Sequence, residues 1–282
     1  MFWIRDIEVL AGGKKFESLG KNGLDIDLDI NFSDGKDPDV SEVIIYNLSD
    51  DSINQIKKDG YCIVNAGYKH MGNKGNVLSG DIEEVTTTWQ GLDKETKIKV
   101  TDGGKEWRKA KISKTYKENT KASVIMRDVI NIMGYEIVEL EPKNDKVYKL
   151  GKTVNGFCSD ILKMLVKDTE SKMFVNKNRI IIRDQEKGTK TDFVLSPETG
   201  LVGSPTLNRD NTGDKAGGVS SDKEKKENKQ EKKTWQVTCL LNPKIETDSI
   251  IQVKSKVLNG TFRVIKGKHT KYFETVLTVE EA

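Results

Sequence analysis

GDIEEVTTTWQGLDKETKIKV at residues 80–100 and GTFRVIKGKHTKYFETVLTV at residues 260–279 share one pattern, and this pattern decides the fold. Each stretch begins at a glycine, runs as a strand-like segment, turns through polar residues, and resumes as a second strand-like segment at Glu-Thr. The glycine and the glutamate are fifteen positions apart in the first stretch and fourteen in the second. The pattern predicts two similar β modules, one near each end of the chain, although strand–turn–strand patterns also recur by chance in β-rich proteins.

Segments outside the repeat strengthen the β prediction. YCIVNAGY (61–68) and SIIQVKS (249–255) are strand-like and precede the two copies. LDIDLDI (24–30) alternates apolar and acidic residues, which is the period of a strand with one buried face. Its other face carries three like charges, and we consider a metal site, a charged channel wall, or simply a solvated strand face. The residues concerned are Asp25, Asp27 and Asp29.

Composition narrows the class of protein. The chain of 282 residues exceeds a typical domain, so two or three domains are expected. The net charge of +3 is too small to indicate specific nucleic-acid binding. No apolar run reaches the roughly 20 residues of a membrane span, so no membrane anchor is expected. The start, MFWIRDIEVLAGG, lacks the pattern of a signal peptide.

The changing periodicity predicts three domains, and the fold class is mainly β with an α/β insert. Residues 1–112 read as an antiparallel β domain with one short helix, 113–190 as a middle domain of helices and a hairpin, and 191–282 as a second β domain. A charged stretch at about 209–233 interrupts the last domain. It has too few apolar residues to form a core, so we predict a flexible loop.

The middle domain holds two predicted amphipathic helices and a hairpin. We predict the first helix over 120–134, between Thr120 as N-cap and Gly134 as C-cap, and the second over 151–171. The hairpin turn is expected at 176–178, because asparagine tolerates positive φ. The side chains predicted to point inward are Val124, Ile125, Val129, Ile132 and Met133 in the first helix, and Val154, Phe157, Ile161, Leu162 and Leu165 in the second.

The cysteines and histidines show no catalytic or metal-binding pattern. Cys62, Cys158 and Cys239 are far apart in apolar segments, which favours buried, reduced thiols in a protein made in a cytoplasm. We interpret His70 and His269 as surface turn residues. No cofactor and no metal are expected.

No motif of a known enzyme class is present either. Asp102 is one candidate carboxylate for glycan hydrolysis, but it reads more readily as a turn residue. Trp107 lies in the basic stretch from Lys105 to Lys117. We interpret this stretch as a solvated strand with alternating lysines, with a basic wall beside passing DNA as the alternative. No catalytic residue is predicted, and the chain is not expected to be an enzyme.

Segments spread along nearly the whole chain resemble one family. They are IYNLSDDSINQIKKDGYCIVNAGY (45–68), SGDIEEVTTTWQGLDKETKIKVTDGG (79–104), ISKTYKENTKAS (112–123), TGLVGSPTL (199–207) and the stretch from CLLNP to GKHT (239–270). Together they resemble the baseplate hub proteins of phage tails, especially the contractile-tail type of Gram-positive hosts and of related phage-like bacteriocins. The charged stretch at 209–233 is not covered.

The resemblance implies a structural function. It implies two related β-barrel tube domains per chain and a homotrimer whose six barrels match the six-fold tail tube to the three-fold central spike. The implied partners are the tail tube or tube-initiator protein, the spike protein, other baseplate proteins and the tape-measure protein, in a virion tail baseplate assembled in the host cytoplasm. Asp25, Asp27 and Asp29 would then line the channel or a subunit seam. A peptidoglycan- or glycan-binding module built on the middle domain is the alternative.

Overall fold

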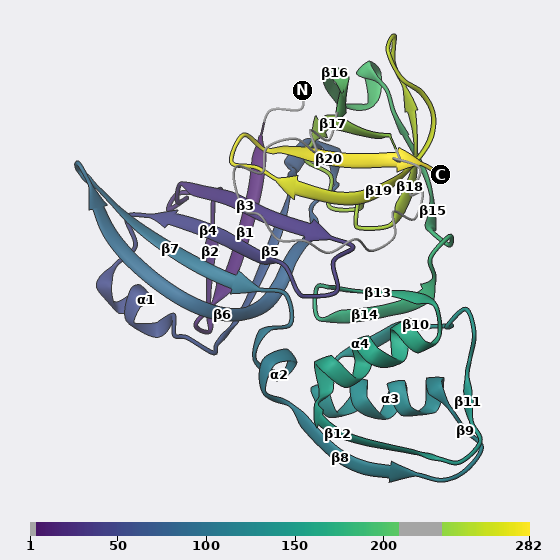
Figure 1. Ribbon diagram of the computed structural model, residues 1–282. Helices are drawn as coiled ribbons and strands as arrows, with labels where there is room; N and C mark the ends of the chain where they lie inside the picture. The colour runs from purple at the N-terminus through teal and green to yellow at the C-terminus, as the bar shows by residue number, and fades with distance from the viewer. Residues whose placement is uncertain (1–3, 209–232) are drawn as a thin grey trace, which may run out of the picture.

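A computed structural model describes residues 4–208 and 233–282 (Figure 1). The fold is mainly β, as predicted. The charged loop predicted at 209–233 lies outside the described residues except for its last position. We divide the described chain into a first strand unit (residues 5–101), a middle unit (104–184) and a second strand unit (189–281).

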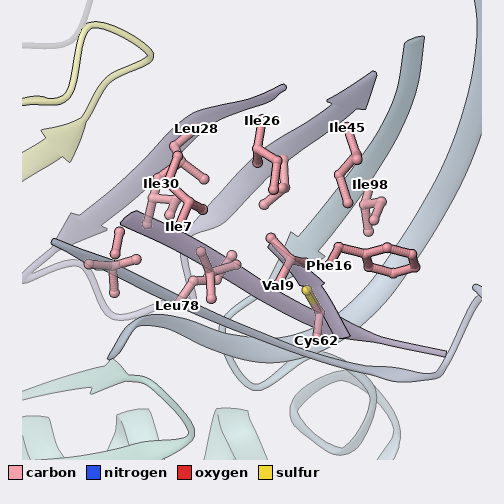
Figure 2. Close-up of a cluster of buried hydrophobic side chains, with 14 of the residues drawn as sticks. Ile7, Val9, Phe16, Ile26, Leu28, Ile30, Ile45, Cys62, Leu78 and Ile98 are labelled. Carbon is pink, nitrogen blue, oxygen red and sulfur yellow. The ribbon is translucent and has the colours of Figure 1, made fainter. Parts of the chain in front are cut away.

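Alternating sequence patterns form the first strand unit. Its elements are β1 (Arg5–Ala11), β2 (Lys14–Glu17), β3 (Ile26–Ser33), β4 (Val40–Tyr46), α1 (Asp50–Gln55), β5 (Tyr61–Tyr68), the 3-10 turn η1 (Lys69–Met71), β6 (Gly75–Gln90) and β7 (Asp93–Thr101). Every second residue of β3 is buried, as the LDIDLDI pattern predicts. Figure 2 shows how apolar side chains from β1, β3, β4, β5, β6 and β7 meet in one core.

The middle unit packs two helices against small sheets. Its elements are α2 (Gly104–Lys109), β8 (Lys111–Tyr116), β9 (Thr120–Lys121), α3 (Ala122–Met133), β10 (Glu136–Leu140), β11 (Val147–Tyr148), β12 (Lys152–Phe157), α4 (Cys158–Asp168), β13 (Ser171–Asn176) and β14 (Arg179–Asp184). The predicted hairpin turn is confirmed: Lys177 and Asn178 have φ of 53° and 60° between β13 and β14.

The helix predictions need two corrections at their starts. Thr120 is not the N-cap of α3, because it pairs with Tyr148 in a short two-stranded ladder and Lys121 precedes the helix instead. The second helix begins only at Cys158, because 152–157 forms β12 beside β8. Gly134 ends α3 in the left-handed conformation, with φ of 74°, as predicted.

The buried face of α3 is also rotated from the predicted one. Val124 and Ile132 are exposed, whereas Met126 and Ile130 are buried. Phe157 is exposed at the end of β12, with the Lys111 ammonium 4.6 Å from its ring centroid. The other predicted core residues of the two helices, Ile125, Val129, Met133, Val154, Ile161, Leu162 and Leu165, are buried.

The second strand unit repeats the strand order of the first. Its elements are β15 (Thr189–Leu195), the 3-10 turn η2 (Pro197–Thr199), β16 (Leu201–Asn208), β17 (Thr234–Leu240), β18 (Ser249–Lys254), β19 (Asn259–His269) and β20 (Glu274–Glu281). Neighbouring strands follow the order β3-β4-β7-β6-β5-β1 in the first unit and β16-β17-β20-β19-β18-β15 in the second. In chain order the six strands therefore correspond one to one.

The two units differ in the direction of one strand pair and agree in their bulges. The β1–β5 pair is antiparallel, whereas its counterpart β15–β18 is parallel. Both long hairpins carry a bulge, at Glu83 in β6 and at Ile265 in β19. Glu95 and Glu274 occupy equivalent places, opposite Tyr46 and Leu240.

Candidate functional site

The first candidate feature is the seam between the two strand units. The first half of β3, Ile26–Asp29, pairs with β4, and its second half, Ile30–Ser33, pairs antiparallel with Lys266–His269 of β19. The units also exchange core residues. Phe32 belongs to the core of the second unit, while Leu241 and Phe273 belong to the core of the first.

His269 lies inside this seam, so its prediction as a surface turn residue is wrong. Its side chain is 2% exposed, and its Nδ1 lies 2.8 Å from the Thr275 hydroxyl. The ring is 5.1 Å from that of Phe32, centroid to centroid. Burial, with a smaller effect of the Lys177 charge, lowers the pKa of His269 to about 3. His70 is exposed in η1, as predicted.

A second contact across the seam is made by the tip of the β19–β20 hairpin. The Tyr68 hydroxyl donates a hydrogen bond of 2.8 Å to the Phe273 carbonyl, and the two rings meet edge to face at 4.9 Å. The Arg5 guanidinium lies 5.5 Å from the Phe273 centroid and donates to the Tyr272 carbonyl at 2.9 Å. The tip of the β19–β20 hairpin is therefore held against the first unit by hydrogen bonds and aromatic contacts.

The three aspartates of LDIDLDI follow the outer face of β3 beside this seam. Asp29 pairs with Lys268 of β19 at 2.7 Å, and Asp27 accepts a hydrogen bond of 3.1 Å from the Tyr46 hydroxyl. Burial and the Asp27 charge raise the pKa of Tyr46 to about 12. Asp25 is exposed just before the strand begins at Ile26. Asp27 and Asp29 border a surface depression of about 430 Å³ that also contains Glu42, Glu95 and Tyr272.

A buried ion cluster joins the middle unit to the second strand unit. Asp248 accepts hydrogen bonds from Arg183, with Nε at 2.9 Å, and from Lys172 at 2.7 Å. Arg183 also contacts Glu139 at 3.0 Å. On the other side Arg263 lies 3.5 Å from Asp248. Burial lowers the pKa of Lys172 although Asp248 opposes this shift. No sequence pattern predicted this cluster; its one signal is the charged end of the apolar strand RIIIRD.

Asp102 connects the first strand unit to the middle unit. Its carboxylate accepts hydrogen bonds from the backbone N–H groups of Lys177 (2.7 Å) and Asn178 (3.0 Å), at the turn between β13 and β14. Burial raises the pKa of Asp102 to about 6, against the effect of these two hydrogen bonds. Asp102 thus joins two units, a role that its position in a sequence turn did not show.

The predicted strand at Lys105–Lys117 is interrupted, because its first part is helix α2. Trp107 belongs to this helix and is buried, and its indole N–H donates to Asp37 at 3.3 Å. Lys163 of α4 contacts the same carboxylate. The basic stretch therefore contributes a packing residue between the first strand unit and the middle unit.

Groups suited to redox or metal chemistry are dispersed. Cys62, Cys158 and Cys239 are buried and free, as predicted. Burial raises the pKa of Cys62 and of Cys239 to about 12. Residues 4–208 and 233–282 contain no group of three or more His, Cys, Asp or Glu placed to hold a metal ion. No helix in these ranges is both long and apolar enough to cross a membrane.

Comparison with known sequences gives one family match. The model of the family described as "Baseplate hub gp41" matches residues 40–210, which is more than half of the chain. No curated protein matches the sequence.

Solved structures share the fold along nearly the whole chain. The 43 kDa tail protein of prophage MuSo2 from Shewanella oneidensis has a TM-score of 0.66 at 12% identity, and the match covers 98% of each chain. A tail protein from Neisseria meningitidis has a TM-score of 0.63 at 9% identity, covering 99% of this chain and 97% of that one. An E. coli type VI secretion component, described as similar to T4 bacteriophage tail proteins gp27 and gp5, has a TM-score of 0.59 at 9% identity, covering 93% and 75%.

Proposed function

Because the chain belongs to the baseplate hub gp41 family, we propose that it is a trimeric adaptor that matches the six-fold tail tube of a phage or phage-like particle to a three-fold central spike. The family and the structural neighbours support a structural role in the tail baseplate. The number of copies that assemble and the proteins that they contact are part of our proposal.

The observation that carries this proposal is the repeated strand order. A chain with two equivalent six-stranded units presents two similar positions, so three chains present six. We propose that each unit is a small tube-like barrel and that the middle unit lies outside the ring, where it contacts other baseplate proteins. The matching of symmetries requires shape and packing only, so no catalytic residue is assigned.

The proposed partners occupy the two ends of the ring. The tail tube or tube-initiator protein would contact the six-fold side, and the spike protein the three-fold side. The tape-measure protein would pass through the channel. We propose Asp25, Asp27 and Asp29 for a polar channel wall or a subunit seam, and Asp29 also pairs with Lys268 within the chain.

Light scattering on the purified full chain tests the proposal. A mass near three times 31.7 kDa supports the adaptor. A monomer that stays monomeric even when the spike protein is added contradicts it. A pull-down on purified cell wall separates the adaptor from a glycan-binding module, because the adaptor predicts no retention.

A further inference from the structure

The β6–β7 hairpin of the first strand unit has a free edge. β6 pairs with β5 through Asp81, but beyond the bulge at Glu83 its residues Glu84–Gln90 pair only with β7. Within residues 4–208 and 233–282 no strand covers the other edge of this segment. In Figure 1 the hairpin extends to the far left of the molecule, away from the other two units. The backbone N–H and C=O groups along this edge are therefore open to another strand.

Most of this edge, beyond the bulge at Glu83, lacks the residues that discourage pairing. Its sequence VTTTW (85–89) consists of β-branched and aromatic residues, which favour strands, and contains no proline or lysine. The edge strand β2, by contrast, carries Lys14 and Lys15. The hairpin also exposes large apolar side chains, with Trp89 70% and Leu92 96% exposed. A groove of about 600 Å³ lies at Glu83–Val85, bounded by α2 through Arg108 and Lys109.

The counterpart of this edge in the second unit is already occupied. Beyond its own bulge at Ile265, β19 pairs with β20 on one side and with β3 on the other. Thr86 and Thr87 lie three and four positions after the bulge at Glu83, as Lys268 and His269 do after Ile265. Lys268 and His269 face Asn31 and Ile30 of β3. The pairing of β19 with β3 is thus made within the chain, whereas the equivalent edge of β6 has no partner among the described strands.

The counterpart of β3 in the second unit is β16, which pairs only with β17 among the described strands. The two registers can be matched step by step. Asp29 faces Glu42, which in turn faces Lys99, four positions after Glu95 of β7. Thr206 faces Gln236, which in turn faces Thr278, four positions after Glu274 of β20. Leu207 and Asn208 therefore correspond to Ile30 and Asn31.

We propose that the free edge of β6 in one copy pairs antiparallel with the end of β16 in a second copy, with Thr86 opposite Asn208 and Thr87 opposite Leu207. This inference rests on the proposed adaptor, because it names the contact through which its copies would meet. The contact is head to tail, since a β6 edge meets a β16 edge, and repetition of such a contact closes a ring of alternating first and second units. The tip with Trp89 and Leu92 would then be covered by the second copy, as Phe273 is covered within the chain.

Disulfide trapping on the full chain tests the register. Facing residues in antiparallel strands have Cα atoms about 4.5–5.5 Å apart, within the range that a disulfide spans. We expect the double variants Thr87→Cys/Leu207→Cys and Thr86→Cys/Asn208→Cys to give covalent dimers and trimers on non-reducing gels, which reductant reverses. The three native cysteines are buried and should not contribute.

The matched control is Thr153→Cys/Leu207→Cys, because Thr153 is an exposed threonine on β12, another strand with one partner. This control should give no covalent product. Equal products in control and test pairs, or no product in either test pair, would overturn the contact. A product from Thr87→Cys alone would also overturn it, because two hairpins would then meet each other.

The disulfide-trapping experiment and the light-scattering measurement test different claims, so either one can fail while the other succeeds. A trimer by light scattering without a trapped β6–β16 product would refute this contact and leave the adaptor standing. A trapped product in a chain that never forms trimers would refute the adaptor's copy number and keep the contact. As a second readout, Trp89→Ala should raise the concentration needed for association, whereas Phe157→Ala, another exposed aromatic on the middle unit, should not.

Discussion

Phe32 of β3 packs directly over Gly267 of β19, so closely that a Cβ atom on the glycine would clash with the Phe32 Cζ. The two residues face each other in the ladder that joins the strand units. The absence of a side chain at position 267 lets an aromatic ring from the first unit enter the core of the second. The seam therefore depends on a small residue at one position.

Gly267→Ala should weaken this seam. The added methyl group must displace both Phe32 and Leu277, and overpacking of this kind typically costs about 1–3 kcal/mol. Urea denaturation measures the loss in free energy of unfolding. Gly35→Ala is the control, because its Cβ would meet only the Ser33 hydroxyl and the Asp37 carbonyl. Equal losses in the two variants would show that the seam tolerates the methyl group.

His269 should make the protein sensitive to acid. The unfolded chain protonates this histidine below its ordinary pKa of 6.5, whereas the folded chain resists protonation down to about pH 3. The unfolded state therefore binds more protons in this window, and stability is lost as the pH falls. The loss should be about 2 kcal/mol at pH 5. His269→Gln should flatten the dependence measured by denaturation between pH 7 and 5. The exposed His70→Gln should leave it as in the wild type.

Asp102 should act in the opposite direction. Its folded pKa of about 6 exceeds the ordinary value of 3.8, so the folded state binds more protons between these values. Stability is therefore lost as the pH rises through this window, by about 3 kcal/mol in total. The difference in unfolding free energy between wild type and Asp102→Asn should change by this amount between pH 3.5 and 7. A constant difference would contradict the buried carboxylate, and Asp50→Asn, on the surface, serves as the control.

Removing the charge of Asp248 should destabilise the junction of the middle and second strand units. Asp248→Asn keeps the shape but leaves the buried cations Arg183 and Lys172 without their main partner. Breaking a buried pair in this way typically costs about 3–5 kcal/mol. Glu42→Gln removes the exposed ion pair with Lys97 and should have a much smaller effect. Similar losses in both variants would mean that water screens the cluster.

Patterns that arise within one strand or one turn could be predicted from the sequence. The alternation in LDIDLDI gave the buried face of β3, and asparagine gave the turn between β13 and β14. The repeat near the two ends indicated the duplicated strand order. Its glycines are not equivalent, however: Gly80 precedes its bulge by three positions and Gly260 by five. Bulges shift the register without leaving a local signal.

Features that depend on distant partners could not be predicted. His269 is buried because β3, more than 200 residues earlier, pairs with its strand. The buried face of α3 differs from the predicted one because α4 and β10 select it. Asp102 and Asp248 look like ordinary turn residues, yet each is held by a unit that its local sequence does not contain.

Because β3 pairs with β4 along its first half and with β19 along its second half, the first strand unit cannot be completed before β19 has been synthesised. During synthesis the partner of Ile30–Ser33 leaves the ribosome more than 200 residues after β3 does, because Lys266–His269 lie that far along the chain. Until then the first unit keeps an open strand edge and lacks Phe273 in its core. We therefore expect a nascent or truncated chain that lacks β19 and β20 to be unable to finish either unit, so that only copies containing both strands are available for assembly.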